Sequence, residues 1–473
     1  MTPLTATFAA STEPVAPIAD GWQLIVAALL GIGVIVLLIT VGKVHPFLAL
    51  IFGAITVGVL AGQDLITTDA TPEGRVDVLT SFATGFGATA AGVGVLIALG
   101  AMFAKLLADS GGADQIVDTI VGHASPRMLP WAMALVGAII GLPMFFEIGL
   151  VLLMPVIYLV ARRANLSLIT IGIPALAGLS AMHGLVPPHP GPLTAIENLQ
   201  ADLGTTLVFG VIVAIPTIVV SGPLFGTLAG RWVVVPAPTR FDADELADRG
   251  RRPSFGITLV AVLLPVVLMM GKALVDILVE DNTAPVRVFF DIIGTPLVAL
   301  LIGVVAGMFL LGRGSGMSFP TISKVLESSL PGIAGIILIV AAGGGFKQVL
   351  VDTGIGTLLA DWAKGADVSV LLLAWVLAVL IRLATGSATV ATITASALML
   401  GVVEGLPAGE VSLVVLAIGA GSVFFSHVND AGFWLVKEYF ALSVGQTIKT
   451  WSLMETALSV SGLVFVLMLG LVV

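Results

Sequence analysis

Residues 100–111, GAMFAKLLADSG, return 243 positions later as residues 343–354, GGGFKQVLVDTG. Similar offsets, between 241 and 250, link other parts of the two halves. The matching residues are Gly100, Phe103, Leu107, Asp109 and Gly111 with Gly343, Phe346, Leu350, Asp352 and Gly354; Leu142, Gly178 and Gly191 with Leu383, Gly419 and Gly432; and Pro46, Ala49, Leu50 and Gly53 with Pro296, Ala299, Leu300 and Gly303. A nearly constant offset over most of a half predicts that one structural plan is present twice.

The composition predicts an all-α polytopic membrane protein. Hydrophobic residues make up 58% of the 473 residues and charged residues only 10%, and the mean hydropathy is +1.13. A soluble domain has about 25% charged residues. The length accommodates roughly ten to twelve spans. The chain has no cysteine, which excludes disulfides, thiolate metal sites and a cysteine nucleophile.

Apolar runs bounded by Gly, Pro or charge give the expected spans. They lie near 22–42, 44–62, 82–107, 168–200, 205–230, 256–279, 292–312, 330–350, 411–440 and 450–473. Two longer runs, 128–161 and 369–401, are interrupted by polar stretches at 141–147 and 382–389. We interpret both as re-entrant hairpins, because non-helical backbone at membrane depth is tolerated where protein buries it or water lines it. The alternative is two short ordinary spans in each run.

The distribution of Lys and Arg gives an orientation. With the N-terminus outside, fourteen of the 20 Lys and Arg residues fall on one side and five on the other, and Arg382 lies in the membrane. The positive-inside rule makes the richer side cytoplasmic and places both termini outside. Each half then has about five transmembrane helices plus one re-entrant hairpin. This odd number of crossings predicts two inverted-topology repeats.

The chain divides at its most polar stretch, which lies between the halves. We expect an N-terminal tail (1–21), a first repeat (22–235), a cytoplasmic linker (236–255) and a second repeat (256–473). The first 20 residues hold no Lys or Arg, so the tail does not resemble a signal peptide.

Glu147 and Arg382 are charged residues inside the two expected hairpins, where charge is expensive and marks a candidate functional site. Arg382 is followed by Thr385, Gly386, Ser387 and Thr389. The guanidinium, the hydroxyl groups and the exposed amides of a helix break suit an anion. The alternative is structural, with Glu147 and Arg382 paired to each other.

The stretch 178–193, GLSAMHGLVPPHPGPL, must unwind at its prolines, next to His183 and His189. The corresponding stretch of the second half, 419–434, reads GAGSVFFSHVNDAGFW. It places Ser426, His427, Asn429 and Asp430 at an expected break. We take His189 and Asn429 as candidate substrate ligands, and Glu147, Asp430 and His427 as candidate proton carriers.

Other classes of function find little support. The motifs HExxH, GxSxG and Walker A are absent, and no basic patch with interleaved aromatics suggests nucleic acid. The chain is therefore not expected to be an enzyme or to use a cofactor. His427, Asn429 and Asp430 lack a spacing that demands a metal ion. The glycine-rich run 341–346 is expected to serve helix packing.

The stretches GLPMFFEIGLVLLMPV (141–156), HGLVPPHPGP (183–192), TGSATVA (385–391) and SHVNDAGFWLVKEYF (426–440) closely resemble the gluconate permease (GntP) family. The resemblance extends from about residue 22 to the end of the chain. It implies a bacterial inner-membrane transporter that imports gluconate or a related small hydroxy-carboxylate by proton symport, although some members carry D-serine. A sodium-coupled carboxylate transporter is the rival interpretation. A channel or an intramembrane enzyme is a more distant one.

The family's superfamily also implies an elevator mechanism and a homodimer. Scaffold helices would lie at 22–125 and 256–365, and the hairpins and broken helices of a transport domain at 126–235 and 366–473. In this scheme Arg382, Thr385, Gly386, Ser387 and Thr389 bind the substrate. His189, Asn429 and Glu147 assist them, and Glu147, Asp430 or His427 takes the coupling proton.

Overall fold

The computed structural model describes residues 16–66, 76–236, 251–279, 281, 283–355, 358, 369–427 and 430–473. These residues form helices joined by turns and loops, and no strand. The expected linker 236–255 and tail 1–21 fall mostly outside them.

The first half is a run of helices whose longer members contain π-helical turns. Its elements are α1 (Gly21–Thr40), α2 (Pro46–Ala61), α3 (Val78–Thr89), η1 (Ala90–Gly94), α4 (Val95–Asp109), α5 (Gly112–Gly122), α6 (Leu129–Gly141), α7 (Phe146–Ala164), α8 (Leu168–Leu185), α9 (Pro190–Leu199), α10 (Leu203–Val219), η2 (Val220–Leu224) and α11 (Phe225–Trp232).

The second half follows a closely similar order. Its elements are α12 (Phe255–Leu278), α13 (Pro285–Ile293), α14 (Pro296–Gly307), η4 (Met308–Arg313), α15 (Phe319–Ser329), η5 (Pro331–Ile333), α16 (Ala334–Asp352), α18 (Val370–Thr385), α19 (Ala388–Val403), α20 (Ala408–Ser422), α21 (Ala431–Tyr439), α22 (Val444–Thr447), η6 (Ile448–Ser452) and α23 (Leu453–Leu469).

Residues matched by the sequence offset occupy matching structural positions. Pro46 and Pro296 each open a helix, where the missing N–H of proline is no loss. Gly111 and Gly354 each follow a long helix and have a φ of +73°, a left-handed conformation that favours glycine. The two halves therefore repeat local geometry as well as sequence.

Eight helical stretches of the described residues are long and apolar enough to cross a membrane, and several shorter apolar helices accompany them. Large apolar side chains are exposed along α1, including Trp22, Leu29 and Leu37. In water this surface would be unfavourable, whereas lipid accommodates it. The fold is that of a multi-pass membrane protein.

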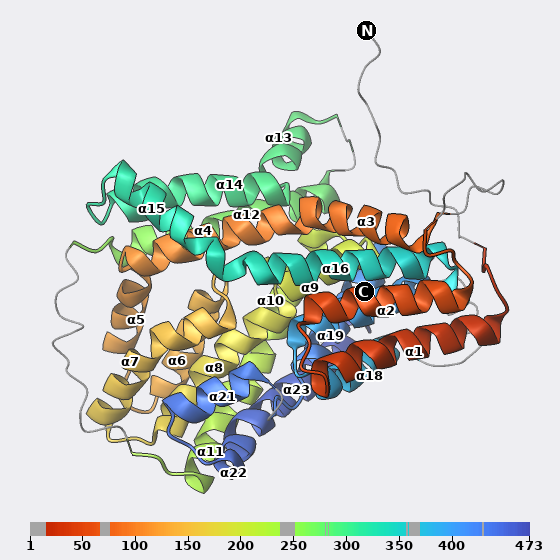
Figure 1. Ribbon diagram of the computed structural model, residues 1–473. Helices are drawn as coiled ribbons and strands as arrows, with labels where there is room; N and C mark the ends of the chain where they lie inside the picture. The colour runs from red at the N-terminus through yellow and green to blue at the C-terminus, as the bar shows by residue number, and fades with distance from the viewer. Residues whose placement is uncertain are drawn as a thin grey trace.

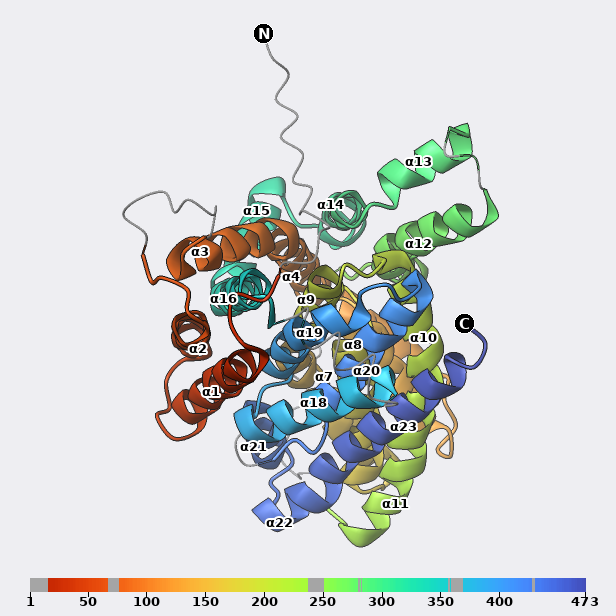
Figure 2. The same cartoon turned by 90° about the vertical axis from the view of Figure 1, so that its right-hand side faces the viewer.

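The helices form two packed groups (Figures 1 and 2). In one, α3 and α2 pack against α16, and α4 packs against α14 and α15. In the other, α6 packs against α8, α18 against α20, and α10 against α20 and α23. Figure 2 shows α9 and α19 beside α16, on the side that faces the second group.

The glycine-rich run 341–346 sits at the junction of these groups, and its predicted packing role is confirmed. A Cβ on Gly344 would lie 2.7 Å from the Gly85 carbonyl oxygen of α3, and a Cβ on Gly343 would lie 2.0 Å from Ile393 of α19. Real side chains cannot approach so closely. Glycine therefore lets α16 pack tightly on both neighbours.

Candidate functional site

Four helical segments are interrupted where the sequence predicts breaks. The interruptions separate α6 from α7, α8 from α9, α18 from α19, and α20 from α21. In α8–α9 the prolines at 187, 188, 190 and 192 account for the break. In α18–α19 Gly386 ends the first helix with a φ of +71°, and the Ser387 hydroxyl accepts a hydrogen bond from Val390 N at 3.3 Å to begin the second.

The four helices that begin after these breaks all start at one cavity. Their first residues, Phe146, Pro190, Ala388 and Ala431, line it. A helix N-terminus carries about half a positive charge and free N–H groups. Four such ends directed at one space make it favourable for an anion.

The cavity has a volume of about 250 Å³. Ile336 and Ile339 of α16 form part of its wall, and the remaining lining comes from the broken helices, η6 and α23. The polar lining residues are Ser180, His183, Arg382, Ser387, Thr389, Asp430, Trp451 and Glu455.

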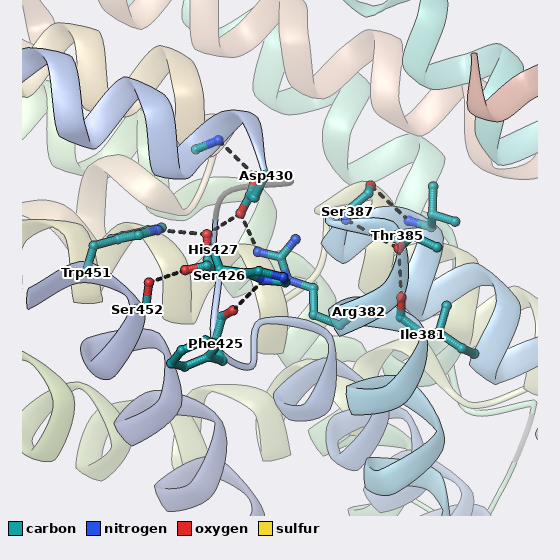
Figure 3. A network of polar contacts seen from close by, with 12 residues as sticks. Ile381, Arg382, Thr385, Ser387, Phe425, Ser426, His427, Asp430, Trp451 and Ser452 are labelled. Carbon is teal, nitrogen blue, oxygen red and sulfur yellow. Dashed lines mark hydrogen bonds and ion pairs between the residues drawn. The ribbon is translucent and has the colours of Figure 1, made fainter. Parts of the chain in front are cut away.

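Arg382, which is buried, and Asp430, which is partly buried, form an ion pair in the lining of this cavity (Figure 3). Arg382 is only 4% exposed, and its Nη2 donates to Asp430 Oδ2. Asp430 caps α21 by accepting a hydrogen bond from Gly432 N at 2.8 Å, and it also accepts one from the Ser426 hydroxyl. Arg382 Nε is buried and has no hydrogen-bond partner among the described residues. The N–H group at Arg382 Nε is therefore not used by the ion pair.

The Asp430 carboxylate is held in place from a third helix. Trp451 Nε1 donates to the Ser426 hydroxyl at 2.8 Å, and the Ser452 hydroxyl donates to the Ser426 carbonyl oxygen. Figure 3 shows Trp451 and Ser452 meeting Ser426 on the side away from Arg382. The Trp451 ring also lies 5.1 Å, between centroids, from the ring of Phe146.

The structure brings five of the residues predicted from sequence to the cavity. These are Arg382, Gly386, Ser387, Thr389 and Asp430. Thr385 is adjacent but does not line it, because its hydroxyl donates to the Ile381 carbonyl oxygen at 2.9 Å.

The two predicted histidines lie beside the site without lining the cavity. His189 Nε2 contacts the Gly141 carbonyl oxygen at 2.6 Å, and His427 Nδ1 contacts the Phe425 carbonyl oxygen at 3.1 Å. His183 lines the cavity instead, and its ring lies 5.3 Å from that of His189.

Asn429 lies outside the residues that the structure describes. The backbone of Glu147 belongs to α7, but its side chain is outside the description. Among the described side chains the ion-pair partner of Arg382 is Asp430, whereas the pairing with Glu147 considered as an alternative lies outside them.

Sequence reasoning missed Glu455. This residue follows the π-helical turn η6, is only 1% exposed and lines the cavity. The sequence feature that could have identified Glu455 is a single carboxylate inside the apolar run 450–473. The same kind of feature identified Glu147 as a candidate. In the described ranges, no group of three or more His, Asp or Glu side chains could hold a metal ion.

The comparisons with known proteins assign the family. A family model described as "GntP family permease" matches residues 22–472. The chain belongs to the GntP permease family. The gluconate permease of Pseudomonas aeruginosa is 48% identical to this permease over 96% of its chain and 98% of the relative's. The Gnt-II system L-idonate transporter of Escherichia coli is 41% identical over 95% and 99% of the two chains.

A solved structure shows a similar fold. The Alcanivorax borkumensis YdaH transporter, whose topology is described as unusual, superimposes with a TM-score of 0.62 at 17% identity. The match covers 90% of this chain and 98% of that one. At this identity the likeness concerns the fold alone. The family and its relatives, which are named as permeases and transporters, show that this permease is a membrane transporter of the gluconate permease group and not an enzyme.

Proposed function

We propose that this permease imports gluconate or a closely related sugar acid by proton symport, and that the substrate occupies the cavity beside Arg382. The observation that carries the proposal is the buried guanidinium at the meeting point of four helix N-termini. The guanidinium and the helix N-termini favour an anion, although Asp430 on the same lining offsets the charge of Arg382.

Within the cavity the substrate carboxylate lies against the Arg382 guanidinium and the amides that follow Gly386. An Arg–carboxylate contact can be bidentate, which orients the bound acid. The hydroxyl groups of a sugar acid then meet Ser387, Thr389 and Asn429. Thr385 contacts the Ile381 carbonyl oxygen and His189 the Gly141 carbonyl oxygen, so both support the backbone at the breaks, and Glu147 follows Phe146 in the first turn of α7. The names of the relatives, which specify gluconate and L-idonate, support a polyhydroxy acid as the substrate.

Proton coupling requires an acidic or basic group that exchanges a proton in step with the substrate. Of Glu147, Asp430 and His427, Asp430 is the described side chain that lines the cavity. A bound proton reduces the buried negative charge that accompanies the substrate, so the two ligands favour each other's binding.

An elevator motion of a transport domain against a scaffold, each built from parts of both inverted repeats, fits the packing. The scaffold would be 22–125 and 256–365, and the transport domain 126–235 and 366–473. The contacts of α16 with α9 and α19 and of α12 with α10 would form the sliding surface. A homodimer joined through the scaffold, in the bacterial inner membrane with both termini outside, completes this arrangement.

The test is thermal stabilisation of the purified protein by a panel of acids. The panel contains gluconate, L-idonate, a hexuronate, D-serine, citrate and succinate, each with and without sodium and at two pH values. A ligand that binds only the folded protein raises the melting temperature by mass action. We expect aldonates to stabilise it, more strongly at the lower pH and equally with or without sodium. A response to a dicarboxylate that requires sodium would reject the proposal in favour of sodium coupling.

A further inference from the structure

Glu455 is a second carboxylate in the cavity, and its surroundings differ from those of Asp430. It projects from the first turn of α23 and is 1% exposed. Ser180 of α8 hydrogen-bonds its side chain, and its oxygen Oε1 is buried without a hydrogen-bond partner in the described part of the chain. Burying a carboxylate with an oxygen left unpaired is unfavourable when the group is charged.

Asp430, in contrast, accepts three hydrogen bonds. They come from Arg382, the Ser426 hydroxyl and Gly432 N, and one of these donors is itself charged. Charge-assisted hydrogen bonds of this kind favour the ionised carboxylate. Asp430 is thus the counter-ion of Arg382 in the structure, and the described residues give Glu455 Oε1 no comparable partner.

The charges of the cluster can be counted in each state. Arg382 and Asp430 together are neutral, so the empty site carries one negative charge when Glu455 is ionised and none when it is protonated. A bound substrate carboxylate adds one more negative charge. If a proton joins Glu455 as the substrate binds, the loaded site carries the same net charge as the empty ionised site, and the like-charge repulsion is relieved.

We propose that Glu455 is the proton-coupling carboxylate of this permease: its unpartnered oxygen takes one proton together with each substrate anion and releases it on the other side. The inference rests on the proposed proton symport and replaces Asp430 with Glu455 as the group that exchanges the proton.

The elements packed around α23 bring few other titratable groups to Glu455. The charged and titratable side chains that face it are Arg382 of α18, Asp430 at the start of α21 and His183 of α8. The sequences of α10 and η2 contain no titratable residue, and Arg231 in α11, Lys449 in η6 and Glu410 at the start of α20 are exposed.

The test compares the wild type with Glu455→Gln in proteoliposomes, with Glu410→Gln as the control. Glutamine has the shape of a protonated glutamic acid but cannot exchange a proton, so the fold and substrate binding should be retained. One proton per substrate anion lets a gradient of about one pH unit sustain about a tenfold accumulation. We expect wild type and Glu410→Gln to reach this ratio. Glu455→Gln should exchange labelled gluconate across the membrane without concentrating it.

Two results would overturn the assignment. One is gradient-driven accumulation by Glu455→Gln at the wild-type level. The other is a Glu455→Gln protein with an unchanged melting temperature that no longer binds gluconate, because Glu455 would then be a substrate ligand and not the coupling group.

A substrate-free readout separates this inference from the proposed function. Infrared difference spectra between acidic and alkaline pH report the carbonyl band of a buried protonated carboxyl group. The wild type and Glu410→Gln should show this band, and Glu455→Gln should lack it. If the wild type fails to accumulate gluconate but shows the band, the proposed function is wrong and the proton site stands. A band unchanged in Glu455→Gln would reject the proton site whatever the transport result.

Discussion

Arg382 is the residue on which the proposed site depends. It is almost fully buried, is paired with one carboxylate and keeps Nε unpartnered in the described structure. Removing one partner of a buried ion pair leaves an uncompensated charge, which costs on the order of 3 kcal/mol. Transport and stability should therefore both depend on this residue, and the two effects can be separated.

We expect Arg382→Ala to abolish gluconate binding and to lower the melting temperature, because Asp430 loses its counter-ion. The double variant Arg382→Met with Asp430→Asn should recover most of the stability but no binding, since it removes both charges. Binding is measured by isothermal titration and stability by thermal denaturation in detergent. Arg127→Ala, at an exposed position, is the control. Retained affinity in Arg382→Ala would remove the guanidinium from the site.

The sequence predicted the individual residues of this pair but not their pairing. Arg382 and Asp430 stood out because charge is rare in apolar runs, and the repeat aligned Asp430 with His189. From the sequence, Glu147 was an equally good partner for Arg382, because the sequence does not show which helix breaks face each other in the fold. Glu455 was missed because the other candidates lie at helix breaks, whereas it reaches the cavity from a helix that is continuous after η6.

At the level of helices, the breaks determine where the cavity lies. Prolines and Gly386 end helices for local reasons, so the sequence could predict the interruptions. It could not predict that four N-termini meet, because their convergence depends on how α6–α9 and α18–α21 pack in three dimensions. That His183 lines the cavity and His189 does not is also a matter of packing.

Gly386 lets α18 end at the cavity wall. Alanine in its left-handed conformation should destabilise the protein by roughly 1–2 kcal/mol, and the shifted backbone should weaken gluconate binding several-fold. Gly405 also has a positive φ, +84°, after the end of α19, where a Cβ would meet no atom within 4 Å, and it has no place in the cavity lining. Gly405→Ala should therefore lower the melting temperature to a similar extent and leave binding unchanged. Equal losses of binding in both variants would show that Gly386 has no particular role at the site.

Gly419 allows α20 to cross α8 closely. A Cβ there would lie 2.1 Å from the Gly184 carbonyl oxygen, so Gly419→Ala must separate the two helices. Overpacking of this kind costs about 1–3 kcal/mol. The melting temperature should fall clearly, whereas Gly87→Ala, with no atom within 4 Å, should leave it unchanged or slightly raised. A Gly419→Ala protein as stable as the wild type would contradict the packing of these helices.

At the level of the whole molecule, the repeated order of helices is visible in the structure, and its inverted orientation in a membrane is a prediction from charge. The chain has no cysteine, so single introduced cysteines report orientation without background. Thr283 lies in the loop before α13 on the expected outer side, and Lys324 lies in α15 on the expected cytoplasmic side.

In intact cells, a membrane-impermeant maleimide should label Thr283→Cys and should label Lys324→Cys only after the membrane is opened. Transport of gluconate by both variants serves as the control for correct folding. The reverse labelling pattern would invert the whole topology, and labelling of both positions from outside would reject the predicted number of crossings.

The central proposal is that a sugar acid binds where four helix N-termini meet Arg382. An experimental structure of the protein bound to gluconate tests it. We predict ligand density in this cavity, with the carboxylate within hydrogen-bonding distance of Arg382 and the hydroxyl groups near Ser387 and Thr389. Density at another place, or a carboxylate that points away from Arg382, would contradict the proposal.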